Sequence, residues 1–299
     1  DVVSVINEFV PPLLKNENIR QVVKDYLSED ENLKQQVIKL YGPINKWDVS
    51  RVTNMSKLFK GAILFNDDIS EWDVSNVRDM SRMFWGASLF DQRLNSWNVS
   101  NVKTMEMMFH TAKSFNQPLD NWNVSNVIDM SEMFRNTKQF NQPLNDWNVS
   151  KVWNVSKVRN MQKMFYNATK FNQPLDNWNV SNVINMADMF SSAESFNNGG
   201  QSSINNWNVS NVINMNSMFC AASSFNQPLN DWNVSKVADM MAMFAAAESF
   251  NKPLNDWNVS KVADMMAMFY DAKSFNIEEN AIWYNSIKPI YKTSFINLL

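Results

Sequence analysis

The chain has 299 residues, of which 45 % are apolar and 19 % charged, and this composition suits a folded chain with a buried core. A net charge of −3 without a clustered basic face excludes an evident nucleic-acid partner, so we expect none. The single cysteine, Cys220, excludes an intramolecular disulfide, and no apolar run is long enough to cross a bilayer, so we expect no membrane insertion by this segment.

Residues 1–40 stand apart from the rest of the chain because they do not repeat. Apolar residues between Gln21 and Leu40 recur at helical spacing, which indicates one or two amphipathic helices. The first unit of a repeat array needs a cover over its apolar face, so we expect residues 1–40 to form a helical N-terminal cap. A linker to a further upstream domain is the alternative.

Residues 41–275 contain nine copies of a 25-residue repeat, each marked by one tryptophan. The tryptophans are Trp47, Trp72, Trp97, Trp122, Trp147, Trp178, Trp207, Trp232 and Trp257. Repetition at this period indicates a solenoid, in which stacked copies bury a core that one copy alone cannot close.

The second half of each repeat has the spacing of a short helix. In the fourth repeat Met130, Met133, Phe134 and Thr137 fall at i, i+3, i+4 and i+7, one face of a helix. Asp129 precedes this face, and its equivalents are all Asn, Asp or Thr, which are helix-capping residues. The sequence therefore predicts a capped helix of two to three turns in every repeat.

The first half of each repeat has the spacing of a short strand. Leu119, Trp122 and Val124 match L-x-x-L-x-L, in which the last two apolar residues point inward. Together the two halves predict an α/β repeat solenoid: a leucine-rich-repeat-like right-handed coil with one short parallel strand and one short helix per 25-residue repeat.

Two insertions interrupt the period, at Lys151 to Val158 and at Asn198 to Ser203. Insertions into a solenoid usually leave it as loops, often on a binding face. Slippage of a repetitive sequence is the simpler explanation, because residues 153–158 copy residues 147–152. After Phe275 the pattern dissolves, and we expect residues 276–299 to form a C-terminal cap.

The repeat string Phe-Asn-Gln-Pro-Leu-Asn-x-Trp-Asn-Val-Ser-x-Val-x-x-Met-x-x-Met-Phe resembles the BspA-like surface-protein repeat, which also occurs in mycoplasma lipoproteins. The resemblance covers Tyr41 to about Phe275. It implies a leucine-rich-repeat-like solenoid at a cell or virus-particle surface, without catalytic residues to carry over. One departure is Val127, which stands where leucine-rich repeats place a buried asparagine ladder.

Reactive side chains are too sparse to suggest catalysis. His110 and Cys220 are the only residues of their types, and they hold the same repeat position four coils apart. Zinc-site spacing, a phosphate-binding glycine loop and a nucleophilic elbow are all missing from the sequence. We therefore predict a non-enzymatic protein with no cofactor and no metal.

Two surfaces are candidates for binding. The first is a polar ladder of Asn and Asp that flank the inward Val of each predicted strand: Asp48, Asp73, Asn98, Asn123, Asn148, Asn179, Asn208, Asn233 and Asn258. Its members either dock an extended ligand such as a polysaccharide or bond to their own turns and neighbouring coils. The second lies on the predicted helix side, where the copies differ.

On that side, repeats seven to nine carry small and apolar residues that make a candidate interaction surface, with aromatic residues at the same position elsewhere. The residues are Met241, Ala242, Ala245, Met266, Ala267 and Tyr270, with Trp85 and Tyr166. Exposed apolar patches often mark protein contacts, although alanine is also a default helix-surface residue.

The leading hypothesis is therefore a scaffold for protein–protein interaction or adhesion, with a protein partner or self-association. The alternatives are a self-associating structural spacer or coat component and a glycan-binding module.

Overall fold

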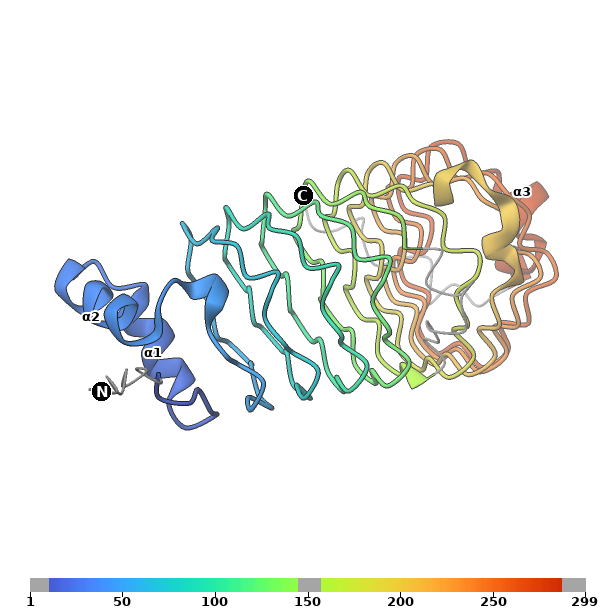
Figure 1. The fold of residues 1–299 in the computed structure, drawn as a ribbon. Helices are drawn as coiled ribbons and strands as arrows, with labels where there is room; N and C mark the ends of the chain where they lie inside the picture. The colour runs from blue at the N-terminus through green and yellow to red at the C-terminus, as the bar shows by residue number, and fades with distance from the viewer. Residues whose placement is uncertain (1–10, 145–156, 287–299) are drawn as a thin grey trace, which may run out of the picture.

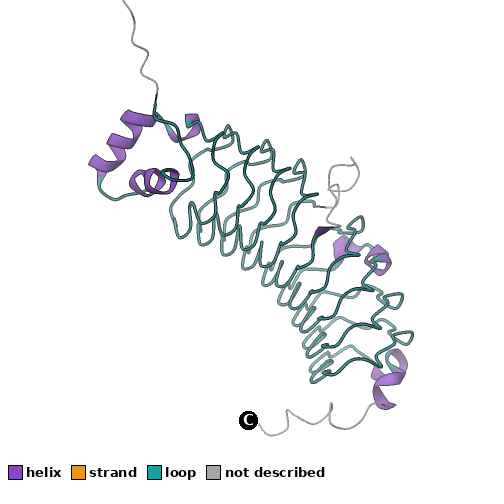
Figure 2. Cartoon of the chain, turned by 90° about the horizontal axis from the view of Figure 1, so that it is seen from below, coloured by secondary structure: helices purple, strands orange, loops and turns teal. Residues whose placement is uncertain are grey.

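The computed structural model of the chain describes residues 11–144 and 157–286. The repeats stack into a curved solenoid with helices at its two ends (Figures 1 and 2). Helix α1 spans Ile19–Tyr26 and α2 spans Glu31–Tyr41, both before the repeats, while α3 spans Ile277–Asn280 after them. Short 3-10 helices are η1 (Ile44–Lys46), η4 (Asn198–Gly200), η5 (Ser202–Asn206) and η6 (Ile282–Ser286).

The core is built from columns of identical aromatic side chains. One column runs from Phe59 to Phe269 with successive ring centroids 5.5–5.8 Å apart, one ring per coil. A second runs from Phe65 to Phe275 beside it, and Phe134 and Phe140 of one coil lie 4.1 Å apart. The apolar positions read from the fourth repeat, Trp122 to Leu144, are all buried. A core shared by stacked repeats is therefore confirmed.

The predicted helix in each repeat is wrong. Residues 55–62 of the first coil form consecutive turns instead, with Leu58 N–H donating to Met55 O and Ala62 N–H to Phe59 O. Lys57 and Gly61, at φ of 61° and 75°, are the third residues of two such turns, as in type II turns. The i, i+3, i+4, i+7 face is buried as predicted, because turns closed between i and i+3 place side chains at nearly the same spacing as a helix.

The reason is that the backbone N–H groups bond to the next coil. In the first coil Met55, Lys57, Phe59 and Gly61 donate to carbonyls 24 residues further on. The same four bonds recur between every pair of consecutive coils, at 2.7–3.2 Å, so every second N–H group of this stretch is unavailable for a helix. These inter-coil bonds also hold each coil's positive-φ residues in place. Such residues are mostly not glycine and cost roughly 1–2 kcal/mol each in isolation.

The predicted strand at Leu119–Val124 is also wrong. Trp122 N–H donates to Leu119 O and Val127 N–H to Val124 O, so this part of the coil is again made of turns. The parallel pairing falls on the residues that we expected to cap helices: isolated bridges join Asn54 to Asp79 and each later equivalent to the next, up to Asp264. In the described residues the ladder is one bridge wide, and the α/β description does not hold.

Those bridge residues keep the acceptor role that the sequence predicted. The side-chain oxygen of Asp79 accepts a hydrogen bond from Ser81 N–H at 2.9 Å, and that of Asp129 from Ser131 N–H at 2.8 Å. The bond closes a turn rather than the first turn of a helix.

An asparagine ladder is present, at a position that the sequence analysis did not assign. The Oδ1 atom of Asn116 accepts a hydrogen bond from Asn141 N–H at 2.9 Å, and Asn141 accepts one from Asn172 in the same way. The ladder runs from Asn66 to Asn276, with Asp91 as its second member. The tryptophans that mark the repeats add a parallel series, in which the indole N–H donates to a backbone carbonyl, as when Trp122 donates to Leu94 O at 2.8 Å.

The described coils keep their alignment on both sides of each insertion. The ladder bond from Asn172 to Asn141 spans 31 residues, so the coils keep their alignment across the first insertion, whose residues 151–156 lie outside the described part. The second insertion forms η4 and η5. Asn198 is fully buried there, and its Oδ1 accepts from Leu175 N–H at 2.8 Å. This insertion packs into the side of the solenoid and does not project from it as a loop.

Candidate functional site

The coils present one surface that repeats in backbone and varies in side chain. We call it the turn face: residues 56, 57, 60 and 61 of the first coil and their equivalents, whose side chains lie outside the hydrophobic core. The inter-coil hydrogen bonds run directly beneath it. One column across this face, from coil one to coil nine, is Lys60, Trp85, His110, Arg135, Tyr166, Ser191, Cys220, Ala245 and Tyr270. The backbone is uniform, and the side chains set the local chemistry.

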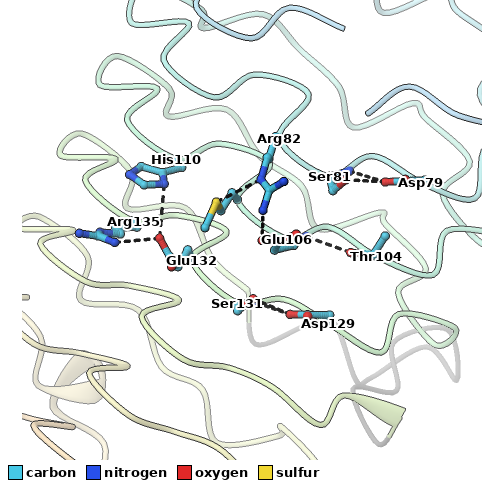
Figure 3. A network of polar contacts seen from close by, with 11 residues as sticks. Asp79, Ser81, Arg82, Thr104, Glu106, His110, Asp129, Ser131, Glu132 and Arg135 are labelled. Atoms are coloured by element: carbon cyan, nitrogen blue, oxygen red, sulfur yellow. Dashed lines mark hydrogen bonds and ion pairs between the residues drawn. The ribbon is translucent and has the colours of Figure 1, made fainter. Parts of the chain in front are cut away.

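Coils two to four carry a charged network on the turn face (Figure 3). Arg82 pairs with Glu106 across one coil junction at 2.6 Å. Glu132 pairs with Arg135 at 2.8 Å, and His110 Nδ1 lies 3.5 Å from the same carboxylate without forming a hydrogen bond. These side chains are half-buried, so the pairs are better shielded from solvent than ordinary surface ion pairs.

Aromatic and cationic side chains alternate along the same part of the face. The Lys60 ammonium lies 4.1 Å from the centroid of the Trp85 ring, and Trp85 stacks on His110 at 5.3 Å. Further along, the Arg135 guanidinium lies 5.0 Å from the Tyr166 ring. A cation is attracted to the face of an aromatic ring, so these contacts stabilise the half-buried positions of Trp85 and Tyr166.

His110 reports on this environment because it is the only histidine in the chain. Burial lowers its pKa below the ordinary 6.5; the Arg135 charge lowers it further, and Glu132 opposes both. We expect the imidazole signals in an NMR titration to move below pH 6.5. Glu132→Gln should lower this pKa and Arg135→Gln should raise it.

The same shift makes stability depend on pH. A pKa that is lower in the folded chain means that the unfolded chain binds the proton more readily, so the free energy of unfolding should fall as pH drops below 6.5. His110→Phe should remove this contribution. An imidazole that titrates at or above 6.5 in the folded chain would show that the side chain is solvated.

The apolar end of the turn face lies in coils eight and nine. Met241, Ala242, Met266 and Ala267 are half-buried there, with Ala242 N–H bonded to Met266 O at 2.8 Å. Tyr270 is 60 % exposed. The structure therefore brings these predicted residues together on one surface, whereas Trp85 and Tyr166 lie in coils two and five.

One member of the predicted surface needs correction. Ala245 is buried, with 7 % of its surface exposed, so it supports the face instead of lining it. Its carbonyl accepts the Ala221 N–H of the preceding coil at 2.7 Å. Its small side chain stands in the column between the larger side chains of Cys220 and Tyr270.

Cys220, in coil seven, has the environment of an unreactive thiol. Burial, followed by the nearby Asp188 carboxylate, raises the pKa of Cys220, and a hydrogen bond with Ser191 opposes them. A thiol is a nucleophile only as the thiolate, so this one is poorly suited to covalent chemistry at neutral pH.

The side-chain oxygens of the polar ladder accept hydrogen bonds from the backbone of their own turns. Asn98 Oδ1 accepts from Ser100 N–H at 3.2 Å, Asn123 from Ser125 at 3.1 Å, and the other described members do the same. Asn148 lies outside the described residues. These side-chain oxygens therefore stabilise the coil, and only the other polar atoms of the same Asn and Asp side chains remain available to a ligand.

These features define a solenoid repeat protein. The chain belongs to the family described as "Mycoplasma protein of unknown function, DUF285", whose model matches residues 15–109, 70–152, 151–202 and 199–293 in tandem. A comparison with curated proteins finds no match.

Among solved structures, one similar chain comes from the crystal structure of a TLR13–ssRNA13 complex, at 10 % identity and a TM-score of 0.25. The match covers 81 % of this chain and 40 % of that one, and at this score it carries no argument. No helix among the described residues is both long and apolar enough to span a bilayer.

Proposed function

We propose that this chain is a non-enzymatic scaffold that binds a protein partner through the turn face, displayed at a cell or particle surface. The observation that carries the proposal is the combination of a uniform backbone ladder with side chains that change from coil to coil. Recognition needs a rigid frame and distinct contacts, and the turn face supplies both.

The apolar end of the turn face is the favoured contact region. Half-buried methionine side chains adapt to varied partners, and Met241 and Met266 lie on adjacent coils beside the exposed Tyr270. Tyrosine and methionine are both enriched at the centres of protein interfaces. Charged side chains of coils two to four would form the polar rim of a longer interface.

The surface setting is supported by resemblance rather than by geometry. The repeat string resembles BspA-like surface-protein repeats, which suggests display outside a cell or on a virus particle. Glycan binding along the polar ladder has less support, because the ladder oxygens already accept hydrogen bonds from their own turns.

Self-association as a structural element is the second candidate, favoured by backbone N–H groups of coil nine that lack a partner within the described part of the chain. In coil eight Met240, Ala242 and Phe244 donate their N–H groups to the next coil, whereas their equivalents Met265 and Phe269 have no acceptor among the described residues. An unpaired row of this kind is a template for another chain.

Charging the apolar end tests the leading proposal. Met241→Glu combined with Met266→Glu should weaken capture of a protein partner from an extract of the source organism by about tenfold or more, because buried charges oppose docking. Ile184→Glu with Ile213→Glu is the matched control, since both residues are exposed and lie outside the turn face. Capture is measured by quantitative mass spectrometry on the immobilised chain.

Equal capture by both double variants would contradict a role for the turn face. Loss of capture after periodate treatment of the extract, but not after proteolysis, would identify a glycan ligand instead. Sedimentation velocity across a range of concentrations addresses the structural alternative, because growth of the species with concentration would show self-association.

A further inference from the structure

A groove of about 660 Å³ lies between α1 and coil one, at the N-terminal end of the array. Helix α1 contributes Arg20, Val23 and Lys24 to one wall, and coil one contributes Lys57, Leu58 and residues 60–65 to the other. Figure 1 shows the two helices beside this first coil. The sequence analysis did not single out this region, because its two walls come from separate parts of the chain.

The groove borders a backbone edge that is only half covered. Everywhere else in the array the equivalent carbonyls accept bonds from the preceding coil, as when Phe59 N–H donates to Met83 O at 2.8 Å. Within residues 11–46 the chain forms α1, α2 and η1, and no repeat coil precedes coil one there. The Arg20 guanidinium reaches Asn54 O and Ser56 O at 3.4 and 3.3 Å, which covers the first part of the edge.

The second part of that edge has no such cover. Among the described residues no group donates to Leu58 O or to Lys60 O, although their equivalents in coil two, Met83 O and Trp85 O, both accept inter-coil bonds. Both residues line the groove. A peptide backbone lying there would therefore meet two carbonyl acceptors spaced as they are in every junction of the solenoid.

The side chains around these carbonyls favour a ligand that carries both negative charge and apolar groups. Four cationic residues line the groove, Arg20, Lys24, Lys57 and Lys60, against one acid, Glu29. Ile63 and Leu64 also line it and are 60 % and 79 % exposed. So large an apolar exposure is unusual on a coil whose remaining apolar side chains are nearly all buried.

We propose that this groove binds an extended, acidic peptide segment of a partner protein. The peptide backbone donates N–H groups to Leu58 O and Lys60 O and thereby adds a partial coil, as strand-adding peptides do at sheet edges. Its carboxylates face Lys24 and Lys57, and its apolar side chains cover Leu64. The site includes the turn-face residues Lys57, Lys60 and Gly61 of coil one and does not depend on coils eight and nine.

The test uses a fluorescein-labelled acetyl-(Glu-Leu)₃ amide and the full chain, with binding measured by anisotropy. We expect saturable binding that the (Lys-Leu)₃ peptide does not reproduce. Lys24→Glu with Lys57→Glu should weaken it by about tenfold or more, since two complementary charges are reversed. Lys103→Glu with Lys138→Glu, at two exposed lysines elsewhere, is the matched control.

Methylation of the backbone nitrogens of the acidic peptide should also weaken binding by about tenfold, because it removes the donors for the two carbonyls. This arm does not depend on the folding of any variant. Equal binding of the basic peptide, or of the methylated peptide, would overturn the proposal, as would binding to phosphatidylserine vesicles without binding to the acidic peptide. Met241→Glu with Met266→Glu should leave peptide binding unchanged. The proposal for this groove and the proposal for the apolar end of the turn face can therefore be contradicted independently.

Discussion

Replacing Phe134 by alanine is expected to lower the free energy of unfolding by about 3–5 kcal/mol. The Phe134 ring is fully buried and stacks on Phe109 at 5.6 Å, on Phe165 at 5.7 Å and on Phe140 at 4.1 Å. Loss of the ring leaves a cavity in a column whose neighbours are fixed by the inter-coil bonds, so the coils cannot close around it. Urea denaturation followed by tryptophan fluorescence measures the change.

The control for this variant is Ile128→Ala, because Ile128 is 47 % exposed in the same repeat. We expect it to change the free energy of unfolding by less than about 0.5 kcal/mol. A cost under about 1 kcal/mol for Phe134→Ala would show that the Phe column is not the core.

Replacing Asn198 by alanine should cost about 2–3 kcal/mol, because it leaves buried polar groups unpaired. The side chain of this fully buried residue accepts from Leu175 N–H and donates to Gln201 O and to Asp176 Oδ1, at 2.7–2.8 Å. These bonds tie the inserted residues to Leu175 and Asp176 of the preceding coil. The same urea denaturation measures the effect.

Two further variants separate the contributions of Asn198. Asn198→Asp keeps the acceptor for Leu175 N–H but places a second carboxylate beside Asp176, so we expect it to be destabilising as well. Ser202→Ala, at an exposed position of η5, should have almost no effect. If Asn198→Ala lowers the free energy of unfolding as little as Ser202→Ala does, the insertion is a tolerated loop that does not contribute to the packing of the solenoid.

The repeat, the buried positions and the shared core could all be predicted, because they depend on which residues recur and how far apart. The backbone conformation could not. A helix and a series of turns closed between i and i+3 bury nearly the same side chains, so Met130, Met133 and Phe134 are compatible with both. Gly61, Gly86 and Asn136 were the available signal, because these types favour the positive φ that a helix interior does not use.

Of the candidate binding surfaces, the sequence indicates the outward positions of the repeats but not the groove beside α1. The outward positions could be predicted, because they vary among otherwise similar copies, but Ala245 was placed on the surface since its burial depends on the neighbouring coil. The groove at α1 was missed. It depends on contacts such as Asn16 with Thr53, which are 37 residues apart and follow no repeat. Local patterns do not report contacts of that kind.

The inter-coil hydrogen bonds beneath the turn face are the basis of both the fold and the proposed recognition surface. Through-hydrogen-bond NMR couplings on the deuterated chain test them most directly. We predict that the Phe109 amide nitrogen couples to the carbonyl carbon of Met133 in the next coil, across the bond of 2.9 Å. Coupling of Phe109 to Met105, four residues earlier, would show a helix in each repeat and would contradict this account.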